Sequence, residues 1–126
     1  MLRLGILGST KGTDLEAIIT AIQKGTLNAK INLVVSNKEN ALLLKRAENN
    51  NIKKEFISDN SISREKYGNL LTQRFKNNDV DVILLIGFMR ILSKSFCDDW
   101  NNKILNVHPS LLPKYAGGIN LSLIHI

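Results

Sequence analysis

The chain has 126 residues, of which 44% are hydrophobic and 22% charged, so one ordinary globular domain is expected and a disordered chain is excluded. The 17 basic residues give a formal net charge of +6 but are scattered along the chain, which favours small anionic ligands over DNA or RNA. One cysteine excludes an internal disulfide framework, and no segment is long and apolar enough for a membrane span. We therefore expect a cytoplasmic monomer or homodimer with small-molecule partners, bound to neither nucleic acid nor membrane.

The first elements read as a strand, a loop and a helix. Residues 2–7 form a short apolar run, and apolar side chains then recur at helical spacing over residues 14–24. Thr13 followed by Glu16 has the form of a capping box, and Gly25 lies where a helix C-terminus is expected.

Predicted strands and helices continue to alternate as far as residue 107. Apolar or β-branched runs predict four further strands, and apolar stripes at helical spacing predict three further helices. The predicted strands are residues 31–36, 54–57, 80–86 and 103–107, and the last helix covers residues 93–100. The strands lack a period of two, which predicts an α/β fold: a doubly wound, mainly parallel sheet with helices on both faces.

The loop after the first strand reads GSTKGTDLEAII. Gly8 and Gly12 precede the predicted helix, whose free N–H groups would form a seat for phosphate. The stretch matches neither a Walker A loop nor the GxGxxG spacing of dinucleotide folds. The alternative is that the glycines only make a tight turn between strand and helix.

The loop after the fourth strand reads GFMRIL, residues 87–92. It combines backbone freedom, apolar side chains and one cation, so a flat and partly apolar ligand could bind there. The alternative is that its apolar side chains belong to the core and that Arg90 is a solvated charge.

The stretch NVHPSLLPKY, residues 106–115, follows the fifth predicted strand. Asn106 and His108 are two residues apart, so in an extended segment both side chains point to the same side. Pro109 and Pro113 stiffen the segment. An amide donor beside a histidine suits acyl transfer, because the amide can stabilise an oxyanion while the histidine moves a proton. The alternative is a structural histidine. With two histidines and one cysteine in the chain, no metal site is expected.

Together, the motifs GSTKGTDLEAI, VVSNK, SREKY, GFMRIL and NVHPSLLPKY resemble the folate-dependent phosphoribosylglycinamide formyltransferases of purine biosynthesis, in order and spacing, to about residue 118. The resemblance implies transfer of a formyl group from 10-formyltetrahydrofolate, the cosubstrate, to the amine of glycinamide ribonucleotide. No metal is implied.

The resemblance also implies roles for particular residues. Asn106 and His108 are the implied catalytic pair: both would stabilise the tetrahedral oxyanion, with protonated His108 as the general acid. The residues implied to hold the phosphate end of the ribonucleotide are Gly12, Thr13 and Asp14. Those implied to contact the folate are Arg64, Met89, Arg90, Ile91, Leu92 and Asn106.

The chain departs from the family pattern at two places. Asp14 stands where the family often has asparagine, which puts a carboxylate near the phosphate seat. The family's later aspartate, which supports the catalytic histidine, has no counterpart in residues 1–126, and the last stretch, LSLIHI, leaves the pattern; His125 is read as incidental. We therefore expect one formyltransferase domain, incomplete at its C-terminal end, with little or no turnover by itself.

Three alternatives stay open. Methionyl-tRNA formyltransferase and formyltetrahydrofolate deformylase resemble the same domain, but the former usually has HASLLP followed by a Trp-Arg-Gly element, and the latter has a second histidine and an N-terminal regulatory domain. The third is a non-catalytic module that binds a phosphate ligand on the same fold.

Overall fold

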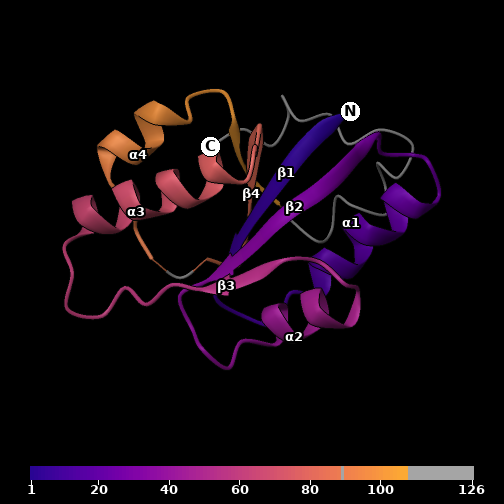
Figure 1. The fold of residues 1–126 in the computed structure, drawn as a ribbon, viewed down its shortest axis with the longest axis horizontal. Helices are drawn as coiled ribbons and strands as arrows, with labels where there is room; N and C mark the ends of the chain where they lie inside the picture. Colours follow the sequence, from indigo (N-terminus) through magenta and orange to yellow (C-terminus); the bar gives the residue numbers. More distant parts are fainter. Residues whose placement is uncertain (89, 108–126) are drawn as a thin grey trace.

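The computed structural model describes residues 1–88 and 90–107, and these form one parallel sheet flanked by helices (Figure 1). The strand order is β3-β2-β1-β4-β5, and every neighbouring pair is parallel. The strands are β1 (Leu2–Gly8), β2 (Ala29–Ser36), β3 (Lys54–Phe56), β4 (Val82–Ile86) and β5 (Ile104–Asn106). The helices are α1 (Thr13–Gln23), α2 (Leu42–Asn49), α3 (Arg64–Asn77) and α4 (Lys94–Asp99).

Helices cover both faces of the sheet, as Figure 1 shows. One apolar cluster joins α1 and α2 to one face of the sheet, and a second cluster joins α3 and α4 to the other face. The fully buried side chains that the helices contribute include Leu15, Ile18, Leu43, Leu71, Phe75 and Phe96. The prediction of a doubly wound α/β sheet is therefore confirmed, and burial from both sides explains why the strands are continuous apolar runs.

The fourth strand begins later than its sequence pattern predicts, at Val82 rather than Val80. The N–H groups of Asn78 and Val80 both donate to the Phe75 carbonyl, at 3.1 Å each. Val80 is thus occupied in ending α3 and is buried among its side chains. The apolar run consequently covers both a helix end and a strand.

The predicted capping box at the start of α1 is wrong. The N-cap residue is Gly12, with φ of 70° and no side-chain cap, and its carbonyl accepts the Leu15 N–H at 2.9 Å. Thr13 is already the first helical residue, so its hydroxyl is one position too late to cap. A left-handed turn, which glycine adopts without strain, starts the helix instead.

The end of α1 follows its prediction. Gly25 has φ of 76° and donates its N–H to the Ile22 carbonyl at 3.1 Å, while Thr26 donates to the Ala21 carbonyl at 3.0 Å. These two bonds form a Schellman motif, which satisfies carbonyls that the helix itself leaves free.

A bidentate ion pair lies at the amino edge of the sheet. Arg3 donates from Nε and Nη2 to the two carboxylate oxygens of Asp81, at 3.0 and 2.8 Å. The hydrogen bonds from Arg3 lower the pKa of Asp81 from 3.8 to about 2.

This pair should contribute to the acid sensitivity of the fold. Because the folded-state pKa is the lower one, the contribution is present above pH 3.8 and is lost as the pH falls toward about 2. The urea midpoint should therefore fall more between roughly pH 5 and pH 2 in the parent chain than in Asp81→Asn. Asp98→Asn, at an exposed ion pair within α4, is the control. Equal acid sensitivity of Asp81→Asn and the parent would contradict this prediction.

Candidate functional site

The loops that follow β1, β2, β3 and β4 all leave from the carboxyl edge of the sheet, because the strands are parallel. The strand order reverses between β1 and β4, since β2 and β3 extend to one side and β4 and β5 to the other. In sheets of this kind, ligands bind at the carboxyl edge beside such a reversal. The loops after β1 and β4 are therefore the first place to look for a site.

Residues 8–12, called the glycine turn below, connect β1 to α1 and are held in place by α2. The Leu43 N–H donates to the Thr10 carbonyl at 3.2 Å, and Arg46 Nε donates to the Lys11 carbonyl at 2.8 Å. Gly12 is buried, and a Cβ added there would lie 2.9 Å from the Leu43 Cα. The turn that precedes α1 is consequently fixed by its contacts with α2 before any ligand binds.

The two other predicted phosphate-end residues follow directly. Thr13 is exposed, and Asp14 is 8% exposed in the first turn of α1. The Asp14 side chain is thus largely withdrawn from solvent. The structure places all three residues, Gly12, Thr13 and Asp14, at one helix start.

The glycine turn and the GFMRIL loop lie against each other. The Ser9 N–H donates to the Gly87 carbonyl at 3.3 Å, and a Cβ at Gly87, where φ is 56°, would lie 2.5 Å from Thr10 Oγ1. A Cβ at Gly8 would lie 2.3 Å from the Ile86 carbonyl oxygen. The loop after β1 and the GFMRIL loop, which are far apart in the sequence, are therefore in contact at the carboxyl edge of the sheet.

Asn106 ends β5 at the same level of the sheet. Leu85 is the register partner of both Leu7 and Asn106, so the three residues form a row across β1, β4 and β5. Two strand spacings put Asn106 about 10 Å from Leu7. The Asn106 side chain is exposed. His108 and Met89 lie outside the described residues, so the pairing of Asn106 with His108 stays a prediction.

The GFMRIL loop divides its side chains between core, ion pair and solvent. Phe88 and Leu92 pack against the cluster under α3 and α4, whereas Ile91 is 69% exposed. Arg90 Nε lies 3.3 Å from Asp59 Oδ2. The alternative that the loop's apolar side chains are core residues thus holds for two of them, whereas the Arg90 side chain is both 39% exposed and paired with Asp59.

Arg64 begins α3 and is exposed. The next residue, Glu65, accepts a hydrogen bond from Ser95 Oγ at 2.5 Å, and a Cβ at Gly68 would lie 2.6 Å from Ser93 Oγ. The start of α3 is therefore beside the residues that immediately follow the GFMRIL loop. A contact of Arg64 with a folate stays a prediction.

Sequence reasoning missed a buried polar network that connects these loops. Ser9 Oγ donates to Asn37 Oδ1 at 2.6 Å, and Asn37 Nδ2 donates to Asp59 Oδ2 at 3.4 Å, where Asp59 meets Arg90. Ser9, Asn37 and Asp59 are 8%, 5% and 7% exposed. The position of Asn37 directly after β2 could have identified it, whereas nothing in the sequence around Asp59 indicates a partner.

Tyr67 lies beside this network. Its hydroxyl donates to the Ile57 carbonyl at 2.6 Å. Burial raises the pKa of Tyr67, the charge of Asp59 raises that pKa further, and the charge of Arg90 opposes the rise. Tyr67 is therefore a neutral donor that fixes the start of the loop between β3 and α3.

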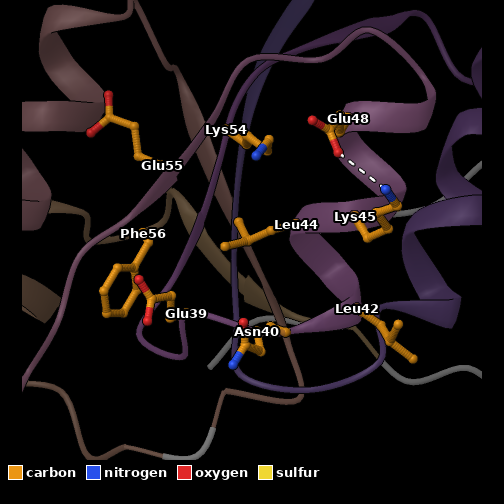
Figure 2. A pocket seen from close by; sticks show the side chains of 10 residues that line it. Glu39, Asn40, Leu42, Leu44, Lys45, Glu48, Lys54, Glu55 and Phe56 are labelled. Carbon is orange, nitrogen blue, oxygen red and sulfur yellow. Dashed lines mark ion pairs between the residues drawn. The ribbon is translucent and has the colours of Figure 1, made fainter.

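Two hollows lie beside α2 and β3. Figure 2 shows the first, of about 480 Å³, between the Lys45–Glu48 side of α2 and the strand residues Lys54, Glu55 and Phe56. The second, of about 490 Å³, shares Phe56 and reaches Ser9 and Asn37. Only the second therefore touches the polar network.

No group of three or more histidine, cysteine, aspartate or glutamate side chains lies close enough together to hold a metal ion within residues 1–88 and 90–107. In the same residues, no helix has the length and apolar character to cross a membrane.

Comparison with known proteins agrees with these motifs. The family described as formyl transferase matches residues 2–123. The phosphoribosylglycinamide formyltransferase of Haemophilus influenzae is 40% identical over 118 residues, which cover 93% of this chain and 56% of the relative. The trifunctional purine biosynthetic protein adenosine-3 of Drosophila pseudoobscura pseudoobscura is 44% identical over 91% of this chain and 9% of its own length.

Solved structures give the same result. The phosphoribosylglycinamide formyltransferase of Coxiella burnetii has a TM-score of 0.81 and 42% identity, over 90% of this chain and 54% of that one. The chain thus spans about half the length of these single-function relatives. Its fold, the five motifs and the family match over residues 2–123 together show that the chain belongs to the formyl transferase family.

Proposed function

We propose that this chain is the N-terminal catalytic part of a phosphoribosylglycinamide formyltransferase, which transfers a formyl group from 10-formyltetrahydrofolate to the amine of glycinamide ribonucleotide in purine biosynthesis. The observation that carries the proposal is the contact between the glycine turn and the GFMRIL loop, through Ser9 and Gly87. It puts a seat for an anion next to a loop with exposed apolar surface. Named relatives with this activity support the assignment.

The phosphate end of the ribonucleotide is assigned to Gly12, Thr13 and Asp14. Main-chain N–H groups at the start of α1 carry a partial positive charge and can donate to phosphate oxygens. The carboxylate of Asp14 opposes this attraction, but its side chain is only 8% exposed. Main-chain donors therefore supply the phosphate contacts in this proposal.

The formyl donor is assigned to the other side of the reversal point. The residues proposed to contact it are Arg64, Met89, Arg90, Ile91, Leu92 and Asn106. Ile91, with 69% of its surface exposed, offers the apolar contact that a flat pterin ring requires. This arrangement would bring the formyl group toward Asn106, and the acceptor amine would extend from the phosphate seat toward the same residue.

The chemistry then needs an oxyanion site and a proton donor. The amine attacks the formyl carbon, and the tetrahedral oxyanion accepts hydrogen bonds from the Asn106 amide and from protonated His108. As the bond between the formyl carbon and the folate nitrogen breaks, the folate nitrogen takes up a proton, which balances the proton that the amine loses. No covalent enzyme intermediate is required.

The test uses a completed protein, in which the remaining C-terminal half of the Haemophilus influenzae relative follows the matched region. Replacing Asn106 with alanine should lower the rate of formyl transfer by a factor of roughly a hundred to a thousand, because one oxyanion donor is lost. Asn101→Ala is the matched control, since Asn101 is exposed in the turn before β5. The measurement is formation of tetrahydrofolate in a spectrophotometric assay.

The same assay separates the other functions. An unchanged rate for Asn106→Ala would contradict the proposed role of the amide. Formate release without an acceptor would indicate hydrolysis, and phosphate-ligand binding without any turnover would indicate a binding module. The 126-residue chain is assayed alongside, and turnover equal to that of the completed protein would contradict the expectation that it is nearly inactive.

A further inference from the structure

The carboxylate of Asp59 connects loops that follow three different strands. Asp59 itself lies in the loop after β3, Asn37 follows β2, and Arg90 follows β4. Asp59 Oδ2 accepts a hydrogen bond from Asn37 Nδ2 at 3.4 Å and lies 3.3 Å from Arg90 Nε. The Asp59 side chain is 7% exposed, whereas that of Arg90 is 39% exposed. The buried partner of this pair is thus the acid.

A buried carboxylate is stable only if donors surround it, because water no longer solvates its charge. Among the described residues, its donors are the Asn37 amide and the Arg90 guanidinium, so the Asp59 carboxylate depends on Arg90 for its own stability and also restrains the Arg90 side chain. Removing the charge of Asp59 would free Arg90 to turn into solvent, since its side chain is already part exposed.

Besides the main-chain hydrogen bond from Ser9 to Gly87, three side chains attach the GFMRIL loop to the described part of the protein. Phe88 and Leu92 attach the loop to the apolar cluster under α3 and α4, and Arg90 attaches it to Asp59. Besides the part-exposed Arg90 side chain, residues 90–92 offer a ligand the exposed Ile91 side chain together with main-chain N–H and C=O groups. Because its guanidinium is paired with Asp59, Arg90 can act on the ligand through the position of the main chain.

We propose that Asp59 is a positioning residue that holds Arg90 and thereby keeps residues 90–92 in the conformation that receives the formyl donor. The inference rests on the proposed function. A purely structural role is the competing explanation, and it would affect both substrates and the whole fold alike.

The first measurement is steady-state kinetics of the completed protein. Asp59→Asn should raise KM for 10-formyltetrahydrofolate about tenfold, the scale of one hydrogen-bonded charge, with kcat and KM for the ribonucleotide changed less than about twofold. Asp81→Asn is the matched control, because it breaks another Asp–Arg pair at the opposite edge of the sheet.

Arg90→Gln extends this measurement to a double-mutant cycle. If Asp59 acts through Arg90, each single variant raises KM for the donor, and combining Asp59→Asn with Arg90→Gln raises it no further. Additive effects would show that the two residues act independently, which overturns the proposal.

The second measurement needs no ligand. In the 126-residue chain, Asp59→Asn should make the amide hydrogens of Arg90, Ile91 and Leu92 exchange several-fold faster, with the amides of β1 unchanged. Unchanged exchange at these three amides overturns the proposal. Faster exchange throughout the sheet also overturns it, in favour of a structural role.

The two measurements keep this inference distinct from the proposed function. If the completed protein transfers formyl groups but Asp59→Asn leaves KM for the donor unchanged, the positioning role fails and the function stands. If the completed protein has no formyl transfer, the proposed function fails, and amide exchange still decides whether Asp59 holds the loop.

Discussion

Replacing His108 with alanine in the completed protein is expected to lower kcat for formyl transfer by a factor of roughly a hundred to ten thousand, the range of a lost general acid. Histidine is the side chain suited to giving and accepting a proton near neutral pH, whereas alanine can neither donate to the oxyanion nor move a proton to the departing nitrogen. KM for both substrates should change little, because the lost interactions strengthen only in the transition state. Initial rates at saturating substrate provide the measurement.

The matched control is the chain's other histidine. His125→Ala, made in the 126-residue chain, should leave ligand binding unchanged, as should His108→Ala. Isothermal titration with the ribonucleotide compares the two variants. Turnover of His108→Ala equal to that of the completed parent would reject the proposed mechanism, and loss of binding together with turnover would indicate a structural histidine.

Gly12→Ala should weaken both the fold and the phosphate seat. Gly12 has φ of 70°, and an alanine Cβ there would lie 2.7 Å from the Leu43 Cδ1 and 2.9 Å from its Cα. The left-handed conformation costs about 1–2 kcal/mol for alanine. Displacing Leu43, which is fully buried in α2, should add about 1–3 kcal/mol. The free energy of unfolding in urea measures the sum.

Gly25→Ala separates the two costs. Gly25 has φ of 76°, close to that of Gly12, but an added Cβ meets nothing within 4 Å. Gly25→Ala should therefore show only the backbone cost, and it should leave binding of the ribonucleotide unchanged. Gly12→Ala should weaken that binding at least about tenfold, since the turn that aims the N–H groups moves. Equal stability of the two variants would show that the contact with Leu43 yields easily.

The strands, the end of α1 and the positions of the site loops could be predicted from local patterns of residues. Apolar runs bounded by glycine and polar residues predicted the strands, because strands covered on both faces need apolar side chains at every position. Gly25 predicted the end of α1, since a left-handed residue after a helix favours glycine. The loops after β1 and β4 and the end of β5 were identified as site positions from the rule that ligands bind at the carboxyl edge.

Which of these loops contact one another could not be predicted in this way, because it depends on how distant segments pack. The capping of α1 by Gly12 rather than Thr13 depends on Leu43 and Arg46, which lie in the next helix. The contact between Asp59 and Arg90 joins the loops after β3 and β4, although β2 and β1 lie between these two strands in the sheet. Such contacts are fixed by packing between distant segments, and local patterns of hydrophobicity carry no signal for them.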